Sequence, residues 1–184
     1  MTRDARRTVP DDPHPLRILI AEDETIIRLD LRDMLERSGH VVCGEARDGE
    51  EAVALAHEEE PELAILDVKM PNLDGIEAAR RILAERPIPI VMLTAYGQDE
   101  LVARAVEAGV FGYLVKPFRE EDVVPAIRAA VPRHAELVSA RRTVGASARS
   151  IAIDLPSESG TAWPLQVTYL PDGTVDVSVR TAAR

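Results

Sequence analysis

The chain has 184 residues, of which 46% are hydrophobic, a formal net charge of −10 and one cysteine. This length suits one domain with an appendage or two small domains, and it is enough to bury a sizeable core. A single cysteine excludes an internal disulfide, so we expect a protein of the reducing cytoplasm. The charged first fifteen residues do not resemble a signal peptide, and no later run is apolar enough to span a bilayer. We therefore expect the protein to be soluble.

The negative charge is concentrated in the middle of the chain. Residues 1–15 carry three arginines and three aspartates, residues 16–131 carry 13 cations and 24 acids, and residues 132–184 carry six cations and five acids. An acidic middle repels a phosphate backbone, which argues against nucleic-acid binding there and favours protein partners or divalent ions. We expect residues 1–15 to be disordered.

Short apolar runs alternate with helix-period segments from residue 16 to about residue 131. Five strands are predicted, at residues 17–21, 40–46, 62–67, 88–94 and 110–116. Several of them are apolar without alternation, which is typical of strands covered on both faces. The segment after the first strand shows the helical period, with apolar residues at Ile27, Leu31, Met34 and Leu35. The alternation predicts an α/β domain with a parallel sheet.

Local signals mark the ends of the predicted helices. Asp48 and Asp74 each precede a glycine at a position typical of an N-cap, whereas Gly39 and Gly109 follow helices that precede the second and fifth strands. The first strand runs into the acidic "EDET" of residues 22–25, so the glycine fingerprint of a dinucleotide-binding fold is excluded.

The pattern changes after Pro132. Residues 132–150 read as a helical extension or linker, and residues 151–184 as a small hairpin, a three-stranded meander or a partly disordered tail. Alternation predicts strands at 150–155, 164–170 and 174–180, the last two flanking a "PDG" turn. Such a piece is marginal alone, and it carries no evident catalytic residues.

Polar side chains follow the predicted strands at the point where each one ends. Glu22 and Asp23 follow the first strand, and Asp67, Thr94 and Lys116 end the third, fourth and fifth. The carboxyl ends of parallel strands share one edge of a sheet, so these groups should converge. Any one acid could be a helix cap, but crowded carboxylates are costly unless a hard cation such as Mg²⁺ lies between them, and Asp23 and Asp67 are the candidate direct ligands.

Lysine is rare in this chain and occurs at the acidic edge. Of 22 cations 20 are arginine, and the two lysines are Lys69 and Lys116. An ammonium suits contact with a single oxygen, so we interpret Lys116 as functional, while Lys69 fits a solvated loop residue equally well. Thr94 fits either β-propensity or a hydroxyl that binds an anion. Together these groups suggest a site for phosphoryl transfer, with Asp67 as candidate nucleophile.

Four segments resemble, in the same order, the receiver domain of bacterial response regulators. They are "EDE" at 22–24, "LDVKMPNLDG" at 66–75, "LTAY" at 93–96 and "YLVKPF" at 113–118. The resemblance spans residues 16–131 and is closest to receivers of the ANTAR type, which carry an RNA-binding antitermination output domain. It implies a flavodoxin-like (βα)5 fold, doubly wound around a parallel sheet, with the β-patterned segment as an appendage.

The resemblance implies a phosphoacceptor in a two-component system. A sensor histidine kinase would phosphorylate Asp67, and Mg²⁺ would be held by Asp23, Asp67 and the main-chain carbonyl of Lys69, with Glu22 acting through water. Lys116 would pair with the phosphoryl group. Such a protein is not an enzyme beyond its own phosphorylation and dephosphorylation.

The resemblance also implies a switch and an interface. Thr94 would move to hydrogen-bond the phosphoryl group, and Tyr113 would swing inward behind it. The bond between Lys116 and Pro117 would be cis, and a homodimer would form through the fourth helix, fifth strand and fifth helix.

The C-terminal part departs from the ANTAR pattern, because residues 145–184 are β-patterned and nearly neutral instead of helical and basic. The resemblance implies an output in transcription antitermination, but the few scattered arginines of this part argue against RNA binding. The tail could dock on the receiver, recruit a partner or replace an output domain. Two alternative functions are a phosphatase with an aspartyl nucleophile, which would need a second acid where Lys69 lies, and a binding module with a vestigial acidic cluster.

Overall fold

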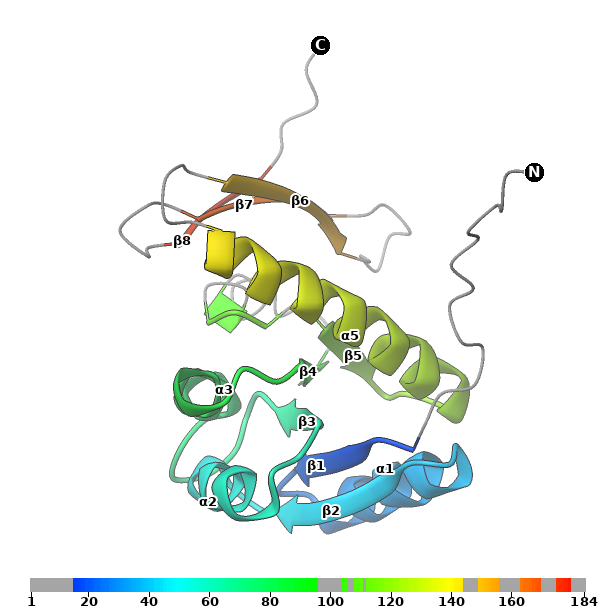
Figure 1. Cartoon of the computed structure of the whole chain (residues 1–184). Helices are drawn as coiled ribbons and strands as arrows, with labels where there is room; N and C mark the ends of the chain where they lie inside the picture. The colour runs from blue at the N-terminus through cyan, green and yellow to red at the C-terminus, as the bar shows by residue number, and fades with distance from the viewer. Residues whose placement is uncertain are drawn as a thin grey trace, which may run out of the picture.

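The computed structural model describes residues 15–95, 104–105, 108–110, 112–143, 149–155, 163–169 and 175–179. The elements of the first part are β1 (Arg17–Ala21), α1 (Thr25–Arg37), β2 (Val41–Ala46), α2 (Gly49–Glu59), β3 (Leu63–Asp67), α3 (Gly75–Glu85), β4 (Ile90–Ala95), β5 (Gly112–Lys116) and α5 (Glu120–Thr143) (Figure 1). The numbering skips α4 because most of residues 96–111 lie outside the described residues.

These strands form a parallel sheet in the order β2-β1-β3-β4-β5. Helices α1 and α5 cover one face, while α2 and α3 cover the other. The doubly wound parallel sheet predicted from the alternating apolar and helix-period segments is therefore confirmed. The order reverses direction at β1, with β2 on one side and β3 on the other, which is where such sheets bind ligands beyond their carboxyl ends.

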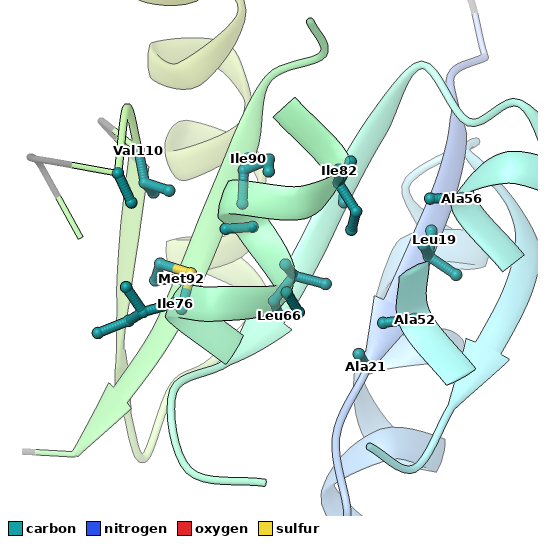
Figure 2. Close-up of a cluster of buried hydrophobic side chains, with 14 of the residues drawn as sticks. Leu19, Ala21, Ala52, Ala56, Leu66, Ile76, Ile82, Ile90, Met92 and Val110 are labelled. Atoms are coloured by element: carbon teal, nitrogen blue, oxygen red, sulfur yellow. The ribbon is translucent and has the colours of Figure 1, made fainter. Parts of the chain in front are cut away.

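The core has two parts because successive residues of a strand face opposite sides of the sheet. Leu19 and Ala21 of β1 pack with α2 and α3, as Figure 2 shows for that cluster. Ile18 and Ile20 pack with α1 and α5 on the other face. All four side chains are fully buried, which explains why this strand shows no polar alternation.

The predicted helix boundaries are confirmed where the chain is described. Asp48 caps α2 by accepting a hydrogen bond from the amide of Glu51 at 2.9 Å, and Asp74 caps α3 in the same way. Gly39 and Gly109 have φ of 85° and 93°, the left-handed conformation expected after a helix.

Four strands of the parallel sheet begin later than predicted, β2 and β3 by one residue and β4 and β5 by two. β4 begins at Ile90 and not at residue 88, because Pro89 has no N–H to donate to a neighbouring strand. β5 begins at Gly112 and not at residue 110, because the amide of Val110 bonds to the carbonyl of Ala105 and so belongs to the turn before the strand.

The C-terminal part matches the predicted pattern where it is described. Helix α5 extends to Thr143, and β6 (Arg149–Leu155), β7 (Trp163–Tyr169) and β8 (Val175–Val179) form an antiparallel sheet in that order. The predicted "PDG" turn and nearly all of the predicted disordered N-terminal segment lie outside the described residues. Among the described helices, none has both the length and the apolar character to cross a bilayer.

Candidate functional site

The carboxyl ends of four strands bring most of the predicted site residues together. Asp67 is the last residue of β3, Lys116 is the last of β5, Thr94 lies one residue before the end of β4, and Glu22 directly follows β1. Glu22, Asp67 and Thr94 have exposed fractions of only 0%, 7% and 4%. Asp23, the next residue after Glu22, is exposed. One edge of the sheet therefore carries a site that is partly buried and partly open to solvent.

Three carboxylates meet at this edge. One oxygen from each of Glu22, Asp23 and Asp67 lies within 4.8 Å of the others. Opposite oxygens around an octahedral Mg²⁺ are about 4.2 Å apart, since each Mg–O bond is about 2.1 Å long. The acids are therefore close enough for two of them to bind Mg²⁺ directly and the third through water, and the all-oxygen donor set suits that ion.

Lys116 neutralises part of this charge. Its Nζ lies 2.5 Å from Oε2 of Glu22 and 3.1 Å from Oδ2 of Asp67. Burial raises the pKa of Glu22 and of Asp67, although contact with Lys116 opposes both shifts. Burial disfavours the charge of Lys116, but the hydrogen bond to Glu22 and the charge of Asp67 outweigh it and raise the pKa of the ammonium. The lysine thus stays charged beside two acids that are costly to ionise.

The other predicted residues occupy separate positions around this cluster. The Thr94 hydroxyl donates to the carbonyl of Ala95 at 3.2 Å. The Tyr113 hydroxyl donates to the carbonyl of Val110 at 3.1 Å, and burial raises the pKa of this phenol. Lys69 is exposed in the loop after β3. The Lys116–Pro117 bond is cis, as the resemblance implied.

The loop between β3 and α3 passes very close to Asp67. The amide of Gly75 donates to the carbonyl of Val68 at 3.1 Å, which brings the start of α3 back onto the end of β3. A Cβ atom at Gly75 would lie 1.9 Å from the carbonyl oxygen of Asp67. A glycine is therefore required here to hold the helix against the strand that carries Asp67.

Arg28 belongs to this region and was not predicted from the sequence. It lies on α1 with an exposed fraction of only 7%, on the same buried face as Leu31 and Leu35. Its Nη1 donates to the main-chain carbonyl of Glu22 at 2.5 Å. The signal that could have found it is its spacing, because Arg28 precedes Leu31 by three residues and Leu35 by seven on the inward face of an amphipathic helix.

Replacement of Glu22 by glutamine is expected to change how stability depends on pH. Burial raises the pKa of Glu22 in the folded state, so the folded protein favours the protonated side chain. The stability that protonated Glu22 contributes is complete below its ordinary pKa of 4.5 and is lost as pH rises through the folded pKa. The variant should therefore gain stability relative to the wild type between pH 4 and pH 7. Urea unfolding in EDTA measures this difference.

Asp48 provides a control of opposite sign, because the amide of Glu51 lowers the pKa of Asp48. The stability that ionised Asp48 contributes is present above its ordinary pKa of 3.8 and is lost as pH falls through the folded value. The Asp48→Asn variant should therefore be less stable than the wild type near neutral pH, and this difference should shrink only below about pH 4. The stability difference between Glu22→Gln and the wild type should change with pH. If it stays constant while Asp48→Asn behaves as expected, the result would contradict the burial of an ionised Glu22.

The family model described as the response regulator receiver domain matches residues 18–128. Transcriptional regulatory protein PdtaR of Mycobacterium tuberculosis (strain ATCC 25618 / H37Rv) is 52% identical over 132 residues, which cover 72% of this chain and 64% of that protein. Chemotaxis protein CheY of Thermotoga maritima is 37% identical over 112 residues, covering 60% of this chain and 93% of CheY. The chain thus spans less than two thirds of the length of PdtaR.

Solved structures agree with these matches. The signal receiver domain of a modulated diguanylate cyclase from Desulfovibrio desulfuricans G20 has a TM-score of 0.62 and 33% sequence identity, and the match covers 67% of this chain and 98% of that one. The predicted fold and the predicted resemblance are both confirmed. Since the family model covers more than half of its residues, the chain belongs to the response regulator receiver domain family.

Proposed function

We propose that the protein is a phosphoacceptor of a two-component system and that a sensor histidine kinase phosphorylates Asp67. The observation that carries the proposal is the Asp67 carboxylate at the carboxyl end of β3, 3.1 Å from the ammonium of Lys116 and beside the acids Glu22 and Asp23. A nucleophilic carboxylate, a cation and an acidic metal-binding group are the parts that phosphoryl transfer to a protein requires.

In this reaction a carboxylate oxygen of Asp67 attacks the phosphorus of a phosphohistidine. The P–N bond breaks as the O–P bond forms, and the imidazole leaves. Lys116 pairs with oxygens of the arriving group, for which its position near Asp67 is suited. Asp23, Asp67 and the main-chain carbonyl of Lys69 would hold Mg²⁺, with Glu22 acting through water. When bound, Mg²⁺ neutralises the phosphoryl oxygens.

The surface next to the site suits a protein as phosphoryl donor. Ile26 and Leu29 lie on the first turns of α1, beyond Asp23, and their exposed fractions are 76% and 40%. Two large apolar side chains one helical turn apart offer contact area to a partner protein, which a small phosphoryl donor would not need.

We further propose that phosphorylation acts as a switch within residues 16–131. Thr94 would exchange its bond with Ala95 for one with the phosphoryl group, and Tyr113 would turn inward from its contact with Val110. Residues 132–150 would link this domain to residues 151–184. A homodimer through β5, α5 and the undescribed segment before β5 is part of this proposal, and RNA binding is not.

Treatment with acetyl phosphate and Mg²⁺ tests the proposed function. We expect a mass gain of one phosphoryl group per chain that requires Mg²⁺ and is lost on later addition of alkaline hydroxylamine, which cleaves acyl phosphates. Continued release of phosphate from a phosphomonoester, without saturation at one group per chain, would instead indicate a phosphatase. Absence of both labelling and Mg²⁺ binding would indicate a vestigial site and overturn the proposal.

A further inference from the structure

Arg28 is a buried cation that the proposed phosphoryl transfer does not use. Only 7% of it is exposed, although arginine is rarely buried unless its charge has partners. Its Nη1 donates to the carbonyl oxygen of Glu22 at 2.5 Å, and its Nε lies 3.5 Å from a carboxylate oxygen of Glu45 on β2. The guanidinium therefore connects α1 with the end of β1 and with the edge strand.

The carbonyl that Arg28 binds belongs to the peptide between two acids of the site. The amide of Glu22 still donates to the carbonyl of Ala46 at 3.1 Å, so β1 remains attached to β2 at that point. The ladder then ends, and Arg28 supplies the hydrogen bond for the carbonyl of Glu22. A buried carbonyl without a donor would be costly, so this bond replaces the missing ladder partner.

Holding this carbonyl restricts Asp23. A peptide unit is planar, so fixing the C=O of Glu22 also fixes the direction of the N–H of Asp23 and limits where the Asp23 side chain can start. Asp23 itself is exposed, and the amide of Glu24 after it donates to Oε1 of Glu22 at 3.2 Å. That bond holds the neighbouring residue but does not orient the Glu22 carbonyl, which is the contact that Arg28 supplies. Its carboxylate nevertheless has to stay within reach of Glu22 and Asp67 to share a cation with them.

We propose that Arg28 is a positioning residue, which orients the Glu22–Asp23 peptide so that the Asp23 carboxylate can bind a divalent cation together with Asp67. This inference rests on the proposed function, since that function requires the cation. It adds a residue on α1 that touches neither the cation nor the phosphoryl group.

The sign of the effect separates positioning from simple electrostatics. A guanidinium near a divalent cation repels it, so removal of this charge alone should tighten Mg²⁺ binding. If Arg28 orients Asp23, its removal should weaken Mg²⁺ binding in spite of the lost repulsion. Loss of a residue that orients metal ligands commonly weakens metal binding by about tenfold or more.

Calorimetric titration of the full chain with MgCl₂ alone tests the proposal. Arg28→Met is expected to weaken Mg²⁺ binding about tenfold. Arg32→Met is the matched control. Arg32 lies one turn further along α1 and also pairs with Glu45, at 3.2 Å, so this substitution removes the same charge from the same partner. Mg²⁺ binding to Arg32→Met should stay within about twofold of the wild type, since exposed ion pairs contribute little.

Kinetics provide a readout that a general loss of stability would not produce. At saturating Mg²⁺ the rate of labelling by acetyl phosphate should return in Arg28→Met to nearly the wild-type rate, because Asp67 and Lys116 are unchanged. The variant should thus differ in the Mg²⁺ concentration needed for half-maximal rate and not in the maximal rate.

Three results would overturn the proposal: Mg²⁺ affinity of folded Arg28→Met equal to that of the wild type, equal weakening in Arg32→Met, or a rate that stays low at saturating Mg²⁺. Should Arg28→Met not fold, Arg28→Lys serves in its place, because lysine keeps the charge but lacks the planar guanidinium with its several N–H donors. Mg²⁺ binding to Arg28→Lys should be about threefold weaker than to the wild type. Unchanged affinity in that variant would overturn the proposal too. A wild type that binds no Mg²⁺ would instead contradict the proposed function.

Discussion

Asp67→Asn should remain folded but lose the ability to take up phosphate from acetyl phosphate. Asparagine has nearly the same shape and keeps an oxygen that can accept from Lys116, which lies 3.1 Å from the carboxylate. Its neutral amide is not a nucleophile, so labelling should fall by at least about a thousandfold, since removal of an attacking group from an enzyme lowers its rate by that much or more. Intact-protein mass spectrometry in the presence of Mg²⁺ measures the labelled fraction.

Asp74→Asn is the matched control for this substitution. Asp74 lies in the same loop and caps α3 by accepting from the amide of Glu77, and asparagine caps a helix as well as aspartate does. Labelling of this variant should therefore equal that of the wild type. A phosphate that persists in Asp67→Asn, or one that disappears in Asp74→Asn, would contradict the assignment of Asp67 as the acceptor.

Asp67→Asn should also change the stability of the protein. Burial raises the pKa of Asp67, which means that the ionised carboxylate is less favourable in the folded protein than in water. The stability that goes with its protonated form is lost as pH rises through the folded pKa, so the wild type carries this penalty at pH 7. Removal of the charge should leave the melting temperature in EDTA equal to or above that of the wild type.

The sheet was predictable because its strands follow simple rules. The apolar run of β1 predicts a buried strand, and the polar residue that follows it predicts where the strand ends. The structure has this strand at the predicted residues 17–21. The start of β4 was predicted two residues too early, because periodicity registers Ile88 as a strand residue and does not weigh the missing N–H of Pro89. The apolar pattern thus predicts that a strand is present better than it predicts the residue at which the hydrogen bonds of that strand begin.

The site was predictable in part for a topological reason. Parallel strands end on one edge, so Asp67 and Lys116 could be placed together although 49 positions separate them in the sequence. The sequence did not indicate that Lys116 also pairs with Glu22, since that depends on side-chain reach. Arg28 escaped prediction because an arginine on a helix normally faces solvent, and its partner is a main-chain carbonyl that no residue type reveals.

Gly75→Ala is expected to produce the largest loss of stability of any substitution considered, because the added methyl group meets backbone. The new Cβ would lie 1.9 Å from the carbonyl oxygen and 2.9 Å from the carbonyl carbon of Asp67. Neither atom can rotate away, so α3 has to move off the end of β3 and the 3.1 Å bond from Gly75 to Val68 lengthens or breaks. Overpacking of this kind costs about 1–3 kcal/mol and the lost hydrogen bond about 1 kcal/mol more.

Gly39→Ala separates this clash from the ordinary cost of replacing a glycine. Gly39 has φ of 85°, which alanine tolerates poorly, but a Cβ there would meet no atom within 4 Å. Its cost should be about 1–2 kcal/mol, from the left-handed backbone conformation alone. Urea unfolding of both variants should place Gly75→Ala well below Gly39→Ala, and similar midpoints would contradict the close approach. Because the atom that Gly75 approaches belongs to Asp67, Gly75→Ala should also slow labelling by acetyl phosphate under conditions where it is still folded, whereas Gly39→Ala should not.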